Sequence, residues 1–366
     1  MPVFRALAGR PGIDLTVYHG DVPNLANAPP DGFRAVHVPV ARVRVGRRTA
    51  LWHPPQWALA AGGQADVLCL SWDLHYAGLV PALLRAQAQG VPTILWGHGY
   101  SKRESPVRAR LRRAVTRLAT AVLFYDHRTA ARHVRAGADP ARVFVAANAL
   151  DGAPIAVARD AWSSDPARLS RFRAGRGLDA RPVVLFVSRL DPDNRVDLLL
   201  HAAARLGDGV QVAVIGDGPD RARLESLAGL LGLRERVRFT GAIYDEHAVA
   251  PWFLTSAAFC YPANVGLSLL HAFGYGVPVV TGDDLAAHNP EIAALRPDEN
   301  GLLFRAGDAA DLSRVLARLL ADASLRARLS TGARDTVAGP FSLDRMVDGF
   351  EAAVRFCARP AARATG

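Results

Sequence analysis

Short apolar runs alternate with amphipathic stretches of helical length along the second half of the chain. The runs span residues 182–190, 210–218, 237–243, 257–263 and 277–283. This alternation is typical of a parallel sheet with helices packed on its faces. It predicts a doubly wound α/β domain of five or six strands over residues 181–340. Because such a fold serves many functions, it does not by itself assign one.

The first half of the chain repeats the pattern less regularly. Strands are predicted at residues 13–20, 35–40, 65–72, 92–99, 119–126 and 142–150. Residues 156–180 carry no strand signal, so we expect a first domain over 1–155, a connection over 156–180 and the second domain over 181–340. Apolar residues at helical spacing after Gly339 and Pro340 predict a terminal helix and tail over 341–366.

The first ten residues already show a helical pattern. A doubly wound domain normally opens with a central strand and a glycine loop, and we expect this opening strand to be missing from the first domain. Two explanations stay open: the start codon is assigned too far downstream, or the domain truly lacks the strand.

Composition limits the class of protein. A chain of 366 residues exceeds what one core usually organises, and its 50% hydrophobic content argues against disorder. No apolar stretch is long enough to span a membrane, no signal peptide is visible, and three scattered cysteines fit neither a disulfide framework nor a zinc site. These features favour a cytoplasmic protein.

The charge balance predicts an anionic partner. The formal net charge is +10, and 43 arginines accompany a single lysine, Lys102. Nucleic acid, an acidic membrane surface and phosphorylated ligands all fit. Nucleic acid is the weakest of these, because the chain has no zinc spacing and no basic-aromatic repeat. The arginine-rich segment Arg108 to Arg117 is either a solvated helix or one that lies on anionic lipid at the inner membrane face.

The most specific stretch is YPANVGLSLLHAFGYGVPVVTGDDLAAHNPEIAALRPDENGLLF, residues 261–304, preceded by FVSRLDPDNRVDLLLHA and VIGDGP. In this order the motifs resemble the donor-binding domain of the retaining GT-B glycosyltransferases of family 4. The resemblance covers about residues 181–355, and WGHG and NALD extend it weakly into the first half. It implies two Rossmann-like domains facing across a cleft, with the nucleotide sugar in the second domain and the acceptor in the first.

Backbone and arginine donors are the expected phosphate ligands. The segment Gly266, Leu267 and Ser268 begins a helix, where free N–H groups can hold a diphosphate, although a plain helix start is the alternative. Arg189, which closes a strand, matches the arginine that meets the donor phosphates in the family. The family's nearby lysine is absent because Asn194 stands there, and Arg195 is either its substitute or a solvated charge.

Other residues are expected around the nucleotide. Gly216 and Gly218 form the tight turn that lies beside the nucleotide in the family, although any strand-to-helix crossover favours glycine. Ala242 and Ile243 stand where the family stacks its base.

Two glutamates of the family motif are replaced here by Ala263 and His271. His271 is either a hydrogen-bonding partner of the ribose or a structural histidine. Sugar recognition is therefore expected from the backbone or from residues that follow these positions, namely Asn264, His288, Asn289 and Glu291. Glu291 matches the PE loop of the family.

His98 lies at a predicted strand end of the first domain. The resemblance places a histidine there, facing the sugar, and an imidazole is suited to proton handling near neutral pH. A structural histidine is the alternative.

Together these features predict a retaining glycosyltransferase that uses a nucleotide diphosphate sugar as substrate, with no cofactor or metal. Its catalytic residues would be His98, Arg189 and Arg195, and its acceptor a glycan or a lipid-linked sugar in surface polysaccharide, lipopolysaccharide or glycolipid synthesis. The competing hypothesis is a non-catalytic GT-B protein that binds a sugar nucleotide or a partner enzyme.

Overall fold

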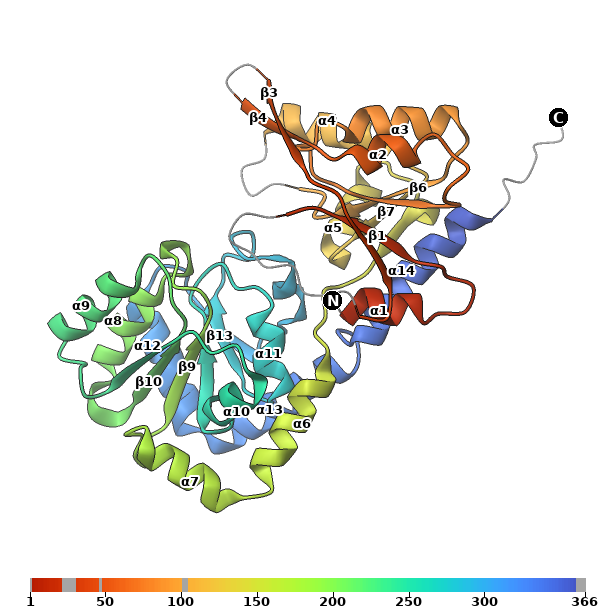
Figure 1. The fold of residues 1–366 in the computed structure, drawn as a ribbon. Helices are drawn as coiled ribbons and strands as arrows, with labels where there is room; N and C mark the ends of the chain where they lie inside the picture. The colour runs from red at the N-terminus through yellow and green to blue at the C-terminus, as the bar shows by residue number, and fades with distance from the viewer. Residues whose placement is uncertain (1, 22–30, 46–47, 101–104, 360–366) are drawn as a thin grey trace. The chain divides into compact units, whose positions relative to one another are not determined.

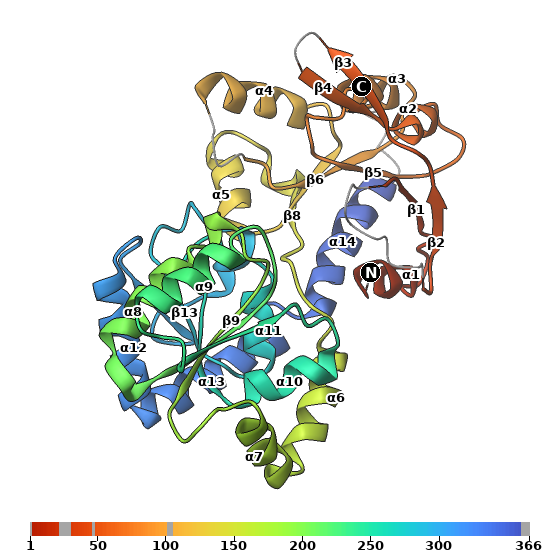
Figure 2. The same cartoon turned by 60° about the vertical axis from the view of Figure 1, so that its left-hand side comes forward.

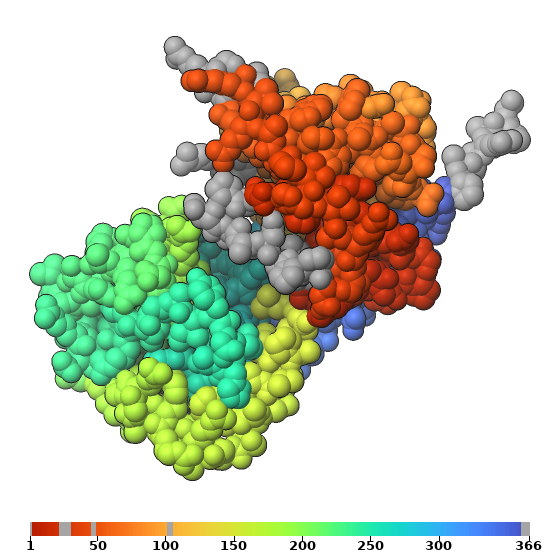
Figure 3. All heavy atoms as spheres, in the orientation of Figure 1, coloured from red at the N-terminus to blue at the C-terminus, as the bar shows by residue number. Residues whose placement is uncertain are grey.

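The computed structural model describes residues 2–21, 31–45, 48–100 and 105–359. The chain forms two compact units (Figure 1). The first unit comprises Met1–Asn148 and Leu343–Gly366, and the second comprises Ala149–Ser342. Figure 3 shows the same chain as filled atoms.

A six-stranded parallel sheet forms the centre of the second unit. Its strands are β9 (Val183–Val187), β10 (Gln211–Ile215), β11 (Val237–Gly241), β12 (Ser256–Cys260), β13 (Val279–Gly282) and β14 (Gly301–Phe304). They lie in the order β11-β10-β9-β12-β13-β14, with Val184 of β9 opposite Val212 of β10. The apolar runs are buried on both faces, which is why the sequence shows continuous hydrophobic strands rather than alternation. The five strands predicted here are confirmed, and β14 is the sixth.

Helices cover both faces of this sheet (Figures 1 and 2). They are α6 (Gly152–Ser163), α7 (Pro166–Gly175), α8 (Val196–Arg205), α9 (Arg221–Leu230), α10 (Glu246–Leu254), α11 (Ser268–Gly274), α12 (Ala309–Ala321) and α13 (Ala323–Ala338). Helix α8 packs against α9 and α12, whereas α6 packs against α10 and α11. The strand order and the two helical layers are those of a Rossmann-like domain.

The segment expected to connect the domains is part of the second unit. Residues 156–180 lie mostly in α6 and α7, and the units divide after Asn148. Trp162 on α6 donates a hydrogen bond from Nε1 to the carbonyl of His247 at 2.8 Å, and the Arg168 guanidinium lies 3.6 Å from the Trp162 ring centroid. These contacts make the two helices a layer of the domain.

The first unit contains a four-stranded parallel sheet in the order β5-β6-β7-β8 and two separate strand pairs. The sheet strands are β5 (Leu68–Ser71), β6 (Thr93–Gly97), β7 (Ala121–Phe124) and β8 (Val143–Val145). The pairs are β1 (Thr16–His19) with β2 (Arg34–His37), parallel, and β3 (Ala41–Val45) with β4 (Arg48–Trp52), antiparallel. The helices are α1 (Pro2–Ala8), α2 (Pro54–Leu59), α3 (Leu79–Ala88), α4 (Pro106–Thr116) and α5 (His127–Arg135).

The terminal helix α14 (Leu343–Ala358) returns to the first unit. The Phe350 ring packs edge-on against Trp96 with centroids 4.9 Å apart. Nη2 of Arg10 forms an ion pair with Oδ1 of Asp348 at 2.8 Å. A β-carbon at Gly349 would lie 2.1 Å from the carbonyl oxygen of Val145, so only glycine lets α14 approach β8 this closely.

Both units are built on parallel sheets with packed helices, so the predicted α/β class with two Rossmann-like domains is confirmed. Within the part of the chain that the structure describes, no helix is both long enough and apolar enough to cross a bilayer.

Candidate functional site

The strand order of the second unit places a candidate site at the ends of β9 and β12. These two strands are neighbours in the middle of the sheet, and the strands that follow each of them lie on opposite sides. In such sheets the loops after the two central strands diverge and leave a crevice at their carboxyl ends, where ligands bind. Residues 188–194 and 261–268 form these two loops.

Two glycines hold the loop after β10 tightly against the loop after β9. A β-carbon at Gly216 would lie 1.8 Å from the carbonyl oxygen of Ser188, and one at Gly218 would lie 2.5 Å from that of Leu190. Both glycines also have positive φ angles, 151° and 157°. The backbone N–H of Leu190 donates to the carbonyl of Asp217 at 2.9 Å, which joins the two loops at the switch point.

Arg189 follows the end of β9 and carries an exposed positive charge. Its side chain is 69% exposed, and its Nε lies 3.3 Å from Oδ2 of Asp191. An ion pair this exposed contributes little free energy, so a phosphate can compete for the guanidinium at small cost. The position of Arg189 fits the predicted phosphate ligand, and that role remains a prediction.

Three hydrogen-bonded asparagines, which we call the asparagine run, connect the loop after β9 to the loop after β12. Asn194 is 3% exposed and donates from Nδ2 to the carbonyl of Arg189 at 2.7 Å. Asn264 donates to Oδ1 of Asn194 at 3.1 Å, and Asn289 donates to the carbonyl of Asn264 at 3.1 Å. Asn194, where the resemblance leads one to expect a lysine, is thus a buried, hydrogen-bonded amide, which sequence reasoning did not anticipate.

The loop after β12 presents backbone donors at the start of α11. No described residue accepts a hydrogen bond from the backbone N–H groups of Gly266, Leu267 or Ser268. A β-carbon at Gly266 would lie 3.4 Å from Nδ2 of Asn289 and 4.0 Å from Oε2 of Glu291. The structure therefore brings the predicted helix start and the PE loop together.

His288 braces the same loop. Its Nδ1 accepts a hydrogen bond from the backbone N–H of Val265 at 3.1 Å, and Nε2 lies 2.9 Å from the carbonyl of Gly282. Because Nδ1 accepts, Nε2 carries the proton and donates. The ring is 2% exposed and connects β13 to this loop, and its role in sugar recognition remains a prediction.

Arg195 is held by a neighbouring carboxylate. It has a left-handed backbone conformation, φ 54°, and its Nε and Nη2 donate to the two oxygens of Asp197 at 3.0 and 3.1 Å. The hydrogen bond to Asp197 raises the pKa of Arg195 above its usual value. The predicted phosphate role of Arg195 would require it to leave this fork.

His271 forms a polar cluster with two residues of its surroundings. Its Nε2 lies 2.8 Å from Oε1 of Glu246 on α10, and the Tyr275 hydroxyl donates to the same oxygen. Burial raises the pKa of Glu246, but the hydrogen bond and charge of His271 and the hydrogen bond of Tyr275 outweigh it, so the net pKa lies below the usual glutamate value. Burial, followed by the contact with Glu246, raises the pKa of Tyr275.

Glu246 is a second residue that sequence reasoning missed. It stands 25 positions before His271, and no local pattern pairs the two. Only an acidic residue in the first turn of a helix was visible, which is a common helix-start feature.

The predicted base-stacking residues follow β11. Gly216 donates from its backbone N–H to the carbonyl of Gly241 at 2.9 Å, which holds this loop beside the glycine turn. Ala242 is exposed and Ile243 half-buried. Their role in base stacking remains a prediction.

His98 belongs to the first unit. It follows β6 directly, is exposed, and lies beside Tyr125 with ring centroids 4.7 Å apart. Its position at the carboxyl end of a central strand is the one predicted, and its contact with a sugar remains a prediction.

The described residues contain no group of three or more His, Cys, Asp or Glu side chains arranged to hold a metal ion. The charged groups at the switch point include Arg189, Arg195 and the carboxylates of Asp191, Asp197 and Glu291.

The fold and this site define a Rossmann-like ligand-binding domain joined to a second α/β unit, and comparison with known proteins places it more closely. Residues 171–336 match the family model described as "Glycosyl transferases group 1". The lipopolysaccharide core biosynthesis glycosyltransferase LpsE of Rhizobium meliloti is 34% identical over 46% of this chain, and the match spans 48%, about half, of its own length.

Two further comparisons cover more of the chain. The GDP-mannose-dependent alpha-(1-6)-phosphatidylinositol monomannoside mannosyltransferase of Mycolicibacterium smegmatis is 30% identical over 70% of this chain and 67% of its own length. The crystal structure of Anabaena HepE in complex with UDP has a TM-score of 0.67 at 18% identity, over 82% of this chain and 80% of that one, which shows a shared fold. The chain belongs to the group 1 family of glycosyl transferases, and the resemblance seen in its motifs is confirmed at that level.

Proposed function

We propose that the protein transfers a sugar from a nucleoside diphosphate sugar to an acceptor hydroxyl, with retention of the anomeric configuration. The observation that carries the proposal is the switch point between β9 and β12 in a chain of this family, where the exposed Arg189 and the N–H groups of residues 266–268 supply donors for a diphosphate. The names of two relatives, which refer to lipopolysaccharide core and to a phosphatidylinositol mannoside, support a glycan or lipid-linked acceptor.

The proposed chemistry needs stabilisation of a departing diphosphate. The bond between the anomeric carbon and the diphosphate oxygen breaks, the acceptor oxygen bonds to the same face of that carbon, and the acceptor proton passes to the departing phosphate. Arg189 and the N–H groups at the start of α11 neutralise the developing charge, so the proposal requires no metal ion. Arg195 joins them if the donor draws it away from Asp197.

The remaining parts of the donor are assigned to neighbouring residues of the second unit. Ala242 and Ile243, after β11, receive the base, beside the turn of Gly216 and Gly218. His271, charged or neutral, is oriented by Glu246 and donates to or accepts from the ribose hydroxyls.

The transferred sugar is assigned to residues beside the start of α11. Asn264 and Glu291 face it from the loop after β12 and from the PE loop. His98 of the first unit is assigned to the acceptor as a hydrogen-bond partner of its hydroxyl, and the hydroxyl proton itself passes to the departing diphosphate.

Donor binding is tested by thermal unfolding with uridine, guanosine and thymidine diphosphates. A bound nucleotide raises the melting temperature by mass action, and one of the three should do so in the wild type. Arg189→Ala removes charge-assisted hydrogen bonds worth about 1.5–3 kcal/mol, so the affinity should fall by roughly 10- to 150-fold.

Arg314→Ala is the matched control. Arg314 on α12 is equally exposed, at 69%, and is likewise paired with an aspartate, but lies away from the switch point. Its removal should leave the nucleotide shift unchanged. Equal shifts in wild type and Arg189→Ala would contradict the phosphate assignment.

Turnover separates an enzyme from the non-catalytic alternative. The protein is incubated with a panel of nucleotide sugars and lipid-linked or glycan acceptors, and release of nucleoside diphosphate is followed together with the anomeric configuration of the product by NMR. Product with the donor's configuration supports the proposal, and product of inverted configuration contradicts its retaining mechanism. Tight binding with no turnover for any pair would favour a protein that only binds sugar nucleotides.

Helix α4 is proposed to place the enzyme on the inner face of a membrane. Val107 and Leu111, one turn apart, are 74% and 53% exposed, and Arg108 and Arg110 lie between and beside them. Exposed apolar and arginine side chains on one helix suit the interface of an anionic bilayer. Co-sedimentation with phosphatidylserine vesicles should weaken when Val107→Asp and Leu111→Asp are combined, and unchanged binding would contradict this role.

A further inference from the structure

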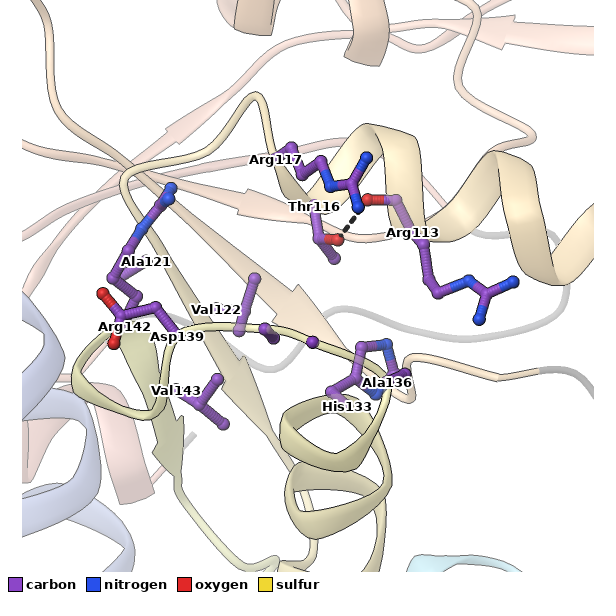
Figure 4. Close-up of a pocket in the computed structure, with 12 residues that line it drawn as sticks. Arg113, Thr116, Arg117, Ala121, Val122, His133, Ala136, Asp139, Arg142 and Val143 are labelled. Atoms are coloured by element: carbon purple, nitrogen blue, oxygen red, sulfur yellow. Dashed lines mark hydrogen bonds between the residues drawn. The ribbon is translucent and has the colours of Figure 1, made fainter.

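A hollow between α4 and α5 in the first unit is lined by arginines that the proposed reaction does not use. Its volume is about 240 Å³. It lies at the amino ends of β7 and β8, whereas His98 follows the carboxyl end of β6. Figure 4 shows that Arg113 and Arg117 enter from the end of α4, and Arg142 from the turn before β8. We call this cavity the α4–α5 hollow.

No carboxylate of the described residues pairs with an arginine of the α4–α5 hollow. Among the residues that the structure describes, the Arg113 and Arg117 side chains form no hydrogen bond or ion pair, and they stand four positions apart on one helix, where like charges repel. Arg142 donates from Nε to the carbonyl of Thr120 at 2.9 Å and from Nη2 to that of Ala119, which fixes its guanidinium without cancelling its charge.

The described lining of the hollow carries little negative charge. Asp139 is the one acidic residue in the described lining, and its Oδ1 already accepts the backbone N–H of Ala141. A second, smaller hollow shares Arg113 with the first and adds Arg112 and Arg132.

We propose that the α4–α5 hollow binds a phosphate monoester, carried either by a small soluble molecule or by a lipid headgroup. A doubly charged phosphate accepts several N–H bonds at once, which suits a cavity lined by arginines from two elements. The volume lies below the roughly 300 Å³ at which sites for larger organic ligands begin, so it suits a phosphate with a small substituent rather than a nucleotide sugar. This site is independent of the donor site in the second unit.

The binding test uses isothermal titration of the full chain with inorganic phosphate and with glycerol 3-phosphate. Arg113→Gln combined with Arg117→Gln should lower both affinities by about tenfold or more, because two charge-assisted contacts are lost. Arg108→Gln combined with Arg110→Gln removes the same charge from the same helix without touching either hollow and should keep wild-type affinity.

Vesicles distinguish the two sources of the phosphate. A lipid ligand predicts that phosphatidic acid vesicles, which present a monoester, bind more tightly than phosphatidylserine vesicles of equal surface charge, and that Arg113→Gln with Arg117→Gln abolishes the difference. A soluble ligand predicts tight glycerol 3-phosphate binding with no such lipid preference.

Three results would overturn the proposal. The first is wild-type protein that binds neither phosphate compound and does not distinguish the vesicles, in which case the arginines serve only the carbonyl end of α4, where cations are also favourable. The second is an equal loss of affinity in the Arg108 and Arg110 variant. The third is a loss in Arg189→Gln but not in the hollow variant.

Discussion

Replacing Asn194 by alanine tests whether the asparagine ties at the switch point serve ligand binding. The change deletes the hydrogen bond that Asn194 donates to the carbonyl of Arg189 and the one that it accepts from Asn264. Each such bond contributes about 0.5–1.5 kcal/mol net, and each partner left buried without a bond adds to the cost. We therefore expect the free energy of unfolding to fall by about 2–3 kcal/mol, which lowers the melting temperature of a domain of this size by roughly 4–12 °C.

The effect on nucleotide affinity separates the site from the scaffold. Asn264 has a left-handed φ of 59°, a conformation that its hydrogen bonds help to hold, and it precedes the N–H groups proposed to bind the diphosphate. Without Asn194 that loop samples other conformations, and we expect the affinity for the stabilising nucleoside diphosphate to fall about tenfold, or about 1.4 kcal/mol. Titration calorimetry below the melting transition measures it.

Asn300 offers a matched control. It is fully buried, and it donates to the carbonyl of Ala294 and to the Thr336 hydroxyl while it accepts from the backbone of Arg296. It lies at the amino end of β14, whereas the switch point lies at the carboxyl ends of the strands. Asn300→Ala should destabilise the fold at least as much and leave nucleotide affinity unchanged. If Asn194→Ala loses stability but keeps full affinity, the asparagine run is structural only and the reasoning fails.

Three further predictions follow from the same geometry. Gly216→Ala forces a β-carbon against the Ser188 carbonyl and should cost more than about 4 kcal/mol of unfolding free energy in urea titration, whereas Gly209→Ala, with open space around it, should be nearly neutral. The pKa of Glu246 is lowered in the folded state, so its stabilising contribution is present above pH 4.5 and is lost as the pH falls through the lowered value. The difference in unfolding free energy between wild type and Glu246→Gln should therefore shrink on acidification. A difference that stays constant with pH would contradict this stabilising role of Glu246. Chelation by EDTA should leave transfer activity intact, and loss that Mg²⁺ restores would refute the arginine-based neutralisation.

The sheet of the second unit was predictable because its strands are buried on both faces and therefore leave continuous apolar runs in the sequence. The glycine turn was predictable from its motif, although the backbone that requires glycine at positions 216 and 218 belongs to the loop after β9. The β3–β4 pair was not predicted, although the alternating arginines and valines of Ala41–Val45 follow the two-residue period of a strand.

The positions of several elements depend on contacts between residues far apart in the sequence, and these positions could not be predicted from the sequence. Helical periodicity predicted α14, but its place beside β8 depends on Gly349 meeting a carbonyl some two hundred residues earlier. Likewise α6 and α7 lack strand signals and so resembled a connection, although Trp162 fastens them to the second unit. At the site, Arg189, Gly266 and Glu291 were identified from motifs, whereas the structural role of Asn194 appears only when the loops after β9 and β12 are seen together.

The cluster around His271 changes the weight of the missing glutamates. Judged from the motif alone, Ala263 and His271 remove both carboxylates and favour a protein without activity. In the fold, however, Glu246 brings a carboxylate from α10 to within 2.8 Å of His271, and Glu291 lies beside Gly266. These two carboxylates lie near His271 and Gly266, at positions that the motif does not name. The predicted replacement of the motif glutamates is therefore no argument by itself against catalysis, and Glu246→Gln measured for both nucleotide affinity and turnover decides whether the Glu246 carboxylate serves the ligand.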